Sequence, residues 1–209
     1  MKNQLKFKYL LSKFKNKYLL STPKHLKKIL SVEGSISPSE CLLLFELASQ
    51  VSSGCIVEIG SYRGRSTVAL ALGSLQNEKV PVYAIEPHET FKGILGGDFG
   101  PNDRAYFFKN ILRTGVGQIV HLINLNSEVA SKGWNKDITL LFIDGDHHWE
   151  AVKRDFHCWE PFVNKDGLIL FHDSLDLNLG PSKVIADAVS SGRWELIRQV
   201  DSTTVLKKV

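Results

Sequence analysis

The chain lacks the features that mark secreted, membrane-spanning or repetitive proteins. Its 209 residues include only three cysteines, Cys41, Cys55 and Cys158, without a Cys-x-x-Cys pair, which indicates reduced thiols. No apolar run reaches the roughly 18 residues that a membrane span needs. Lysines interrupt the apolar stretches near the N-terminus, so no signal peptide is predicted, and neither repeats nor low-complexity segments occur. We therefore expect a cytoplasmic protein.

Acidic residues are missing from the first 32 residues, which contain nine lysines, whereas the remainder contains 17 basic and 22 acidic residues. From Phe7 to Tyr18, apolar residues recur every three to four positions between lysines, the pattern of an amphipathic helix. This helix either packs on the domain with its lysines solvated or docks peripherally on the inner face of a membrane. Nucleic acid is not expected as a partner, because the rest of the chain has no basic face. We divide the chain into a basic helical arm (1–35) and one domain (36–209).

Strand and helix patterns alternate along the domain. Two runs that are apolar apart from Thr139, Ile138–Ile143 and Leu168–Phe171, suit central parallel strands that helices cover on both faces. The β-rich runs Trp194–Val200 and Thr203–Leu206 flank a two-residue link and predict a hairpin. The sequence thus predicts an α/β fold: a Rossmann-like, doubly wound, mostly parallel seven-stranded sheet with an antiparallel C-terminal strand, plus N-terminal helices. The expected strands are 55–59, 81–86, 119–124, 138–143, 167–172 and the hairpin; the expected helices are a short one after Ser21-Thr22-Pro23, one at 38–51 capped by Ser37, and 64–75, 102–114, 126–132, 148–160 and 182–191.

A glycine turn between an apolar strand and a helix predicts a nucleoside site. The strand 55–59 is followed by Gly60 and Gly64, and the next strand ends in a lone carboxylate, Glu86. A βαβ unit of this kind holds a nucleoside through the glycine backbone and places the acid on the ribose hydroxyls. The spacing is Gly-x-x-x-Gly and lacks the further glycine that lets a pyrophosphate approach the helix. The pattern therefore disfavours a nicotinamide dinucleotide and favours a nucleoside such as S-adenosylmethionine.

Polar side chains follow two neighbouring strands. Asp144, Asp146 and His147 follow the strand 138–143, and His172 and Asp173 end the next one. Because ligands bind at the carboxyl ends of parallel strands, we expect Asp144 and Asp173 to face one crevice. Two carboxylates with a nearby imidazole suit Mg²⁺ or Mn²⁺. The alternative, that aspartates only cap the following helices, is favoured for Asp146. The glycine-rich segment 87–102 is either a lid or a surface loop.

These motifs resemble the class I S-adenosylmethionine-dependent methyltransferases over roughly residues 36–209. The run Val57–Ser66 resembles the first motif of catechol-type O-methyltransferases. The run Asp144–Asp155, followed by Phe171–Asp173, resembles a small bacterial group that includes macrolide-sugar O-methyltransferases and cephalosporin-hydroxylase-like proteins.

The resemblance implies a role for each matching residue. The sequence departs from the family pattern at His172, where a metal-binding relative often has a second carboxylate. With His172 as a ligand, a cation tolerant of nitrogen, such as Mn²⁺, is favoured. For the cofactor, the resemblance implies Glu58, Gly60 and Ser61 near the methionine part, within the turn that Gly64 closes, and Tyr62 and Ser66 at the methionine carboxylate. It implies Glu86 at the ribose and Asn126 and Ser127 beside the adenine. For the reaction, it implies Asp144 and Asp173 at the metal and His147 as general base.

The resemblance implies methylation of a hydroxyl of a sugar, glycoside or other small metabolite, with a divalent metal on Asp144, His147 as the base, or both. Two alternatives stay open at this point. One is a metal-independent methyltransferase of the same fold, and the other is a non-catalytic, membrane-attached nucleoside-binding module, suggested by the basic arm. A homodimer through the N-terminal helices is also expected.

Overall fold

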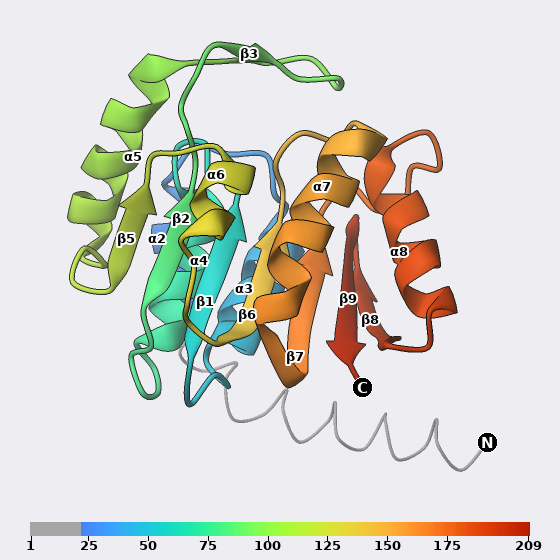
Figure 1. The fold of residues 1–209 in the computed structure, drawn as a ribbon. Helices are drawn as coiled ribbons and strands as arrows, with labels where there is room; N and C mark the ends of the chain where they lie inside the picture. The colour runs from blue at the N-terminus through green and yellow to red at the C-terminus, as the bar shows by residue number, and fades with distance from the viewer. Residues whose placement is uncertain (1–21) are drawn as a thin grey trace.

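A computed structural model describes residues 22–209 of the chain (Figure 1). The amphipathic helix predicted over Phe7–Tyr18 lies outside the described residues, so its contacts stay a prediction. Among the described residues, no helix is long and apolar enough to cross a membrane.

The central element is a seven-stranded sheet in the order β5-β2-β1-β6-β7-β9-β8. Strand β9 runs antiparallel to both β7 and β8, and the other six strands all point the same way. This confirms the predicted sheet with its antiparallel C-terminal strand. Ile59 pairs with Ile85 on one side and with Ile143 on the other, and Ile143 pairs with Phe171. Four strands therefore end level, and the residues that follow them meet at one edge. The strands are β1 (Cys55–Ile59), β2 (Val82–Ile85), β5 (Val120–Ile123), β6 (Ile138–Ile143), β7 (Val163–Phe171), β8 (Trp194–Val200) and β9 (Thr203–Lys208).

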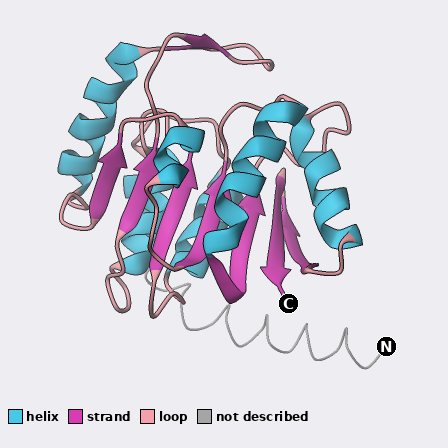
Figure 2. Ribbon diagram, viewed as in Figure 1, coloured by secondary structure: helices cyan, strands magenta, loops and turns pink. Residues whose placement is uncertain are grey.

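Helices cover both faces of the sheet, as expected for strands that are apolar on both sides (Figure 2). Successive residues of β1 point to opposite faces, so Ile56 belongs to one hydrophobic cluster and Val57 to the other. The first face carries α2 (Thr22–Leu30), α3 (Pro38–Ala48), α4 (Arg65–Ser74) and α5 (Pro101–Thr114); the second carries α6 (Ser127–Lys132), α7 (Trp149–Trp159), the 3₁₀ turn η1 (Glu160–Phe162) and α8 (Gly180–Ser190).

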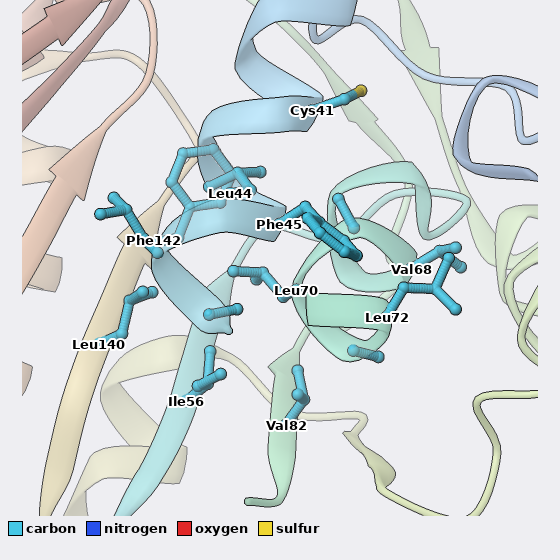
Figure 3. Close-up of a cluster of buried hydrophobic side chains, with 14 of the residues drawn as sticks. Cys41, Leu44, Phe45, Ile56, Val68, Leu70, Leu72, Val82, Leu140 and Phe142 are labelled. Carbon is cyan, nitrogen blue, oxygen red and sulfur yellow. The ribbon is translucent and has the colours of Figure 1, made fainter. Parts of the chain in front are cut away.

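The first cluster forms where α3 and α4 pack on the sheet (Figure 3). Leu44 and Phe45 of α3 lie with Leu70 of α4 over Ile56 and Phe142, and all five are buried. Helix α3 begins with a capping box, in which the Ser37 hydroxyl accepts from the N–H of Glu40 and the Glu40 carboxylate accepts from the N–H of Ser37. The predicted Ser37 cap is therefore confirmed.

Residues 22–36 pack directly on the domain. Ile29 and Val32 are buried in the first cluster. The guanidinium of Arg65, in the first turn of α4, donates hydrogen bonds to the carbonyls of Val32 and Ile36. The short helix predicted after Ser21-Thr22-Pro23 is confirmed as α2, and the domain division at residue 35 stays a prediction.

Three segments differ from the sequence prediction. The segment 87–102 contains a small hairpin, β3 (Phe91–Lys92) and β4 (Asp98–Phe99), which Figure 1 shows above the carboxyl ends of the strands. Strand β7 begins at Val163 instead of 167, because Asp166 and Gly167 lie within the strand at a register shift rather than in a turn that precedes it. Helix α3 ends at Ala48, three residues early.

Candidate functional site

A cavity of about 860 Å³ opens at the edge of the sheet where the strands end. It is lined by loops that follow β1, β2, β6 and β7, together with the β3–β4 hairpin and the loop before α3. The structure brings most of the predicted site residues to this cavity: Gly60, Ser61, Tyr62, Ser66, Glu86, Asn126, Ser127, Asp144, His147, His172 and Asp173. Glu58 and Gly64 are not among its lining residues.

Gly60 is required by packing inside the protein. Its φ is +83°, and a Cβ at this position would lie 2.3 Å from the carbonyl oxygen of Asp144. The carbonyl belongs to the residue after β6, so the glycine allows β1 and β6 to end side by side. The prediction assigned this glycine to the approach of a nucleoside; the structure gives it a packing reason as well.

We expect Gly60→Ala to destabilise the protein by about 2–5 kcal/mol, the sum of a left-handed backbone penalty and an overlap penalty. Gly115→Ala is the matched control, because Gly115 has a φ of +71° but no atom lies within 4 Å of the point that a Cβ would occupy. Urea unfolding of both variants should show the larger loss at Gly60. Equal losses would mean that the contact with Asp144 is not limiting.

Glu86 organises the turn that follows β1. Its Oε2 accepts hydrogen bonds from the N–H groups of Ser61 and Tyr62, both at 3.1 Å, and its Oε1 accepts from the N–H of His88 at 3.0 Å. Tyr62 adopts a φ of +45°, so the carboxylate holds a turn that is otherwise unfavourable for a tyrosine. Each carboxylate oxygen can accept two hydrogen bonds, so Oε1 of this cavity-lining residue can accept one more.

Glu58 lies beneath the turn and is completely buried. Burial raises the pKa of Glu58 to about 8, although the hydroxyl of Thr67 donates a hydrogen bond to Oε2 of the carboxylate. Its Oε1 and the hydroxyl of Ser61 are the two polar atoms of this turn that are buried without a partner among the described residues. Gly64, with a φ of +91°, starts α4 and packs on Phe107.

Asn126 and Ser127 line the opposite wall, at the start of α6. The Asn126 side chain caps the helix by accepting from the N–H of Glu128 at 2.9 Å. The Ser127 hydroxyl accepts from the indole N–H of Trp159 at 2.8 Å. Asp155 of α7 lies beside them, and burial raises the pKa of this carboxyl to about 6. The sequence prediction did not include Asp155.

Four polar side chains converge where β6 and β7 end. His147 Nε2 lies 2.7 Å from Asp173 Oδ2 and 4.0 Å from Asp144 Oδ1. His172 Nδ1 lies 2.9 Å from Asp144 Oδ1 and 3.3 Å from Asp173 Oδ2. Asp144 and Asp173 face one crevice, as predicted, and the imidazoles of His147 and His172 lie between them.

The neighbouring His148 points elsewhere, as expected for adjacent residues in a turn. Its Nδ1 lies 2.6 Å from Asp146 Oδ1, and its side chain is exposed. Asp146 also accepts from the backbone N–H of His148. His148 is the N-cap of α7 and no side chain of the described residues caps this helix, so the helix-capping role predicted for Asp146 is not observed.

His172 is held from behind by a residue that the sequence prediction missed. Its Nε2 lies 3.4 Å from Glu40 Oε2 and 3.2 Å from the hydroxyl of Ser202. Glu40 also accepts from the N–H and the hydroxyl of Ser202 and from the hydroxyl of Thr203. Burial would raise the pKa of Glu40, but hydrogen bonds from His172 and Ser37 lower it to about 2. The sequence predicted only the Ser37 cap at this point, and nothing in it indicated the link from Glu40 to His172.

The hairpin supplies an apolar wall that the sequence did not specify. Phe91, Ile94, Leu95 and Phe99 line the cavity. Phe91, Ile94 and Leu95 are also substantially exposed, at 37%, 47% and 59%. The predicted lid or loop is thus a hairpin whose apolar side chains border the cavity.

The fold and the site define a Rossmann-like α/β domain with a nucleoside-type cradle beside a polar cluster. A family profile described as a methyltransferase domain matches residues 57–174, more than half of the chain, and the chain belongs to this methyltransferase family. The resemblance to class I S-adenosylmethionine-dependent methyltransferases is thereby confirmed.

Similar solved structures share the fold. One is the methyltransferase PaMTH1 of Podospora anserina, solved with bound SAH (18% identity, TM-score 0.67, 89% of this chain and 86% of that chain). Another is an O-methyltransferase of Bacillus cereus in complex with SAH (16% identity, TM-score 0.67, 96% and 97%).

Curated relatives match only in part. An uncharacterized protein of Acanthamoeba polyphaga mimivirus is 38% identical over 63 residues, 27% of this chain and 28% of the relative. The uncharacterized protein y4gI of Sinorhizobium fredii is 29% identical over 127 residues, 57% of this chain. The chain matches only 13% of the length of this second relative.

Proposed function

We propose that this chain transfers the methyl group of S-adenosylmethionine to a hydroxyl of a sugar, glycoside or other small metabolite, with His147 as the general base. The observation that carries the proposal is the 2.7 Å contact between His147 and Asp173, on the same cavity as the turn held by Glu86. A base beside a nucleoside cradle is the arrangement that O-methylation needs, because the hydroxyl must lose its proton as it attacks the methyl group.

The cradle suits S-adenosylmethionine. The hydroxyl of Ser61 is buried, lacks a partner among the described residues and lies at the cavity, so it is available to a polar ligand group. Glu86 retains acceptor capacity for a ribose hydroxyl. Relatives of the same fold were solved with SAH. When bound, the cofactor supplies a methyl group on a positively charged sulfur.

Asp173 orients His147 for proton transfer. Since a carboxylate only accepts hydrogen bonds, the proton of the neutral imidazole is assigned to Nε2, facing Asp173, and Nδ1 carries the lone pair. Burial lowers the pKa of His147, but the hydrogen bond to Asp173 and the charge of Asp144 outweigh it and raise the pKa above its ordinary value of 6.5. The base is therefore strong once it is neutral.

The apolar hairpin supports an acceptor with an apolar portion. Phe91, Ile94 and Leu95 of the β3–β4 hairpin segment border the cavity. A free sugar would leave these side chains facing polar groups, whereas a glycoside with an apolar aglycone would cover them. This favours a glycoside among the candidate acceptors.

The first test is a calorimetric titration with S-adenosylhomocysteine, followed by a screen of hydroxylated glycosides with a labelled methyl donor. We expect binding by the wild type and at least a roughly tenfold loss in Glu86→Ala, because the carboxylate both orders the turn and accepts from the ligand. Glu78→Ala, an exposed position beyond α4, is the control. Binding of a nicotinamide dinucleotide in place of S-adenosylhomocysteine would contradict the proposal.

The pH profile offers a separate prediction. Transfer requires neutral His147, so kcat/KM should rise with pH through a pKa above 6.5. Asp173→Asn removes a carboxylate that stabilises the imidazolium, so the pKa falls and the rising limb moves to lower pH. The plateau should also fall, because an amide can present the wrong group to Nε2. An unchanged limb would show that Asp173 does not act on His147.

A further inference from the structure

We infer that the doubly protonated side chain of His172 occupies the place of a divalent metal, so that this site acts without Mg²⁺ or Mn²⁺. The inference rests on the proposed function for the reaction that the site serves. It concerns the charge at the junction of β6 and β7, where the sequence predicted a metal on Asp144, Asp173 and His172.

Both ring nitrogens of His172 face acceptor oxygens. Nδ1 lies 2.9 Å from Asp144 Oδ1 and 3.3 Å from Asp173 Oδ2. Since a carboxylate accepts hydrogen bonds and donates none, the nitrogen that faces it carries a proton. A histidine that binds a metal must direct a nitrogen lone pair at the ion, and Nδ1 has none in this arrangement.

The second nitrogen is engaged behind the site. Nε2 lies 3.2 Å from the hydroxyl of Ser202 and 3.4 Å from Glu40 Oε2. The Ser202 hydroxyl donates its own proton to Glu40 Oε1 at 2.8 Å, so it offers a lone pair to Nε2. Nε2 therefore also carries a proton, and His172 is an imidazolium.

The surrounding charges match a cation at this point. Asp144, Asp173 and Glu40 contribute three carboxylates around a side chain that is 5% exposed. An imidazolium supplies the positive charge that a metal would bring, in a fixed position.

The donor set does not fit Mg²⁺. This ion prefers octahedral oxygen ligands and keeps several waters, whereas an imidazole separates Asp144 from Asp173 here. One nitrogen or oxygen atom from each of Asp144, His147 and His172 lies within 4.8 Å of the others, which is the set that a nitrogen-tolerant ion would use. Such an ion would have to displace the proton on Nδ1 and also occupy the proposed base, His147.

Glu40 is then a positioning residue that acts through His172. Glu40 comes from the first turn of α3, far along the chain from the strands that supply the other groups. It contacts His172 and not His147. Its part is to hold the imidazolium against Asp144 and Asp173. Besides completing the capping box, the Glu40 carboxylate accepts hydrogen bonds from Ser202 and Thr203, and these bonds fix it in place behind His172.

The test is calorimetric titration of Mg²⁺, Mn²⁺ and Zn²⁺ into the metal-stripped full chain, with and without S-adenosylhomocysteine. We expect no wild-type site with a Kd below about 1 mM. His172→Asp replaces the imidazolium with a further carboxylate beside Asp144 and Asp173 and should raise the affinity for Mn²⁺ at least roughly tenfold. His148→Asp is the matched control, because this exposed histidine also lies beside an aspartate and should gain nothing.

A second measurement needs no variant. In ¹⁵N spectra of the imidazole groups, His172 should show two protonated nitrogens from pH 6 to pH 9. One metal ion bound per wild-type chain, or a neutral His172 at pH 7, would overturn the inference, and so would a folded His172→Asp that gains no Mn²⁺ binding. Binding of S-adenosylhomocysteine is measured in the same samples; its failure would count against the proposed function and not against the metal result.

Discussion

Replacing His147 with alanine should lower kcat by roughly 10²–10⁴-fold, the usual contribution of a general base. Binding of S-adenosylhomocysteine should stay within about a factor of two, because His147 belongs to the wall formed by the β6 end and not to the turn held by Glu86. The measurement is single-turnover methyl transfer to the acceptor found in the glycoside screen, at a pH on the plateau of the wild-type profile.

The adjacent histidine provides the control. His148→Ala removes an exposed ring that pairs with Asp146 outside the Asp173 contact, so transfer should continue at close to the wild-type rate. If His147→Ala kept the wild-type rate, the proton would leave by another route, and Asp144 would be the next residue to change.

Glu40→Ala should destabilise the protein by about 3–5 kcal/mol, because it leaves the buried imidazolium of His172 without its rear carboxylate. The substitution also removes the capping box and the acceptor for Ser202 and Thr203. For a chain of this size, the loss corresponds to a Tm lower by roughly 6–20 °C. Thermal unfolding followed by circular dichroism measures it.

Glu46→Ala is the matched control on the same helix. Glu46 forms a two-point ion pair with Arg198, at 2.9 and 3.1 Å, but its side chain is 31% exposed. An ion pair at the surface contributes about 0–1 kcal/mol, so this variant should melt near the wild type. Equal losses in the two variants would show that the contact between Glu40 and His172 adds nothing beyond an ordinary ion pair.

The sheet was predictable because burial on both faces leaves an almost continuous apolar run. Ile138–Ile143 could be assigned to a central strand before its neighbours were known, and β6 has these bounds. The β3–β4 hairpin could not be predicted, since two-residue strands in a glycine-rich segment have no periodicity to detect. The early start of β7 was hidden for a similar reason: Asp166-Gly167 resembles a turn in sequence and lies at a register shift in the sheet.

Within the site, the residues that follow strands were predictable and those brought by tertiary packing were not. Asp144 and Asp173 follow adjacent parallel strands, so topology alone places them together. Glu40 and Ser202 are separated by 162 positions, and only the packing of α3 beside the β8–β9 turn joins them. The inference that His172 is a cation and not a metal ligand depends on the contact of Glu40 and Ser202 with its ring.

The buried carboxyl beneath the glycine turn makes the fold less stable as the pH rises from about 4.5 to about 8. Glu58 is uncharged in the fold up to a pKa of about 8, whereas an ordinary glutamate ionises near 4.5. The folded state therefore holds one proton more than the unfolded chain between these values, and stability falls by about 1.4 kcal/mol per pH unit across the interval. His147 must lose its proton for transfer, so a higher pH favours the reaction. Over the same range a higher pH weakens the fold through Glu58, so rate and stability respond to pH in opposite directions.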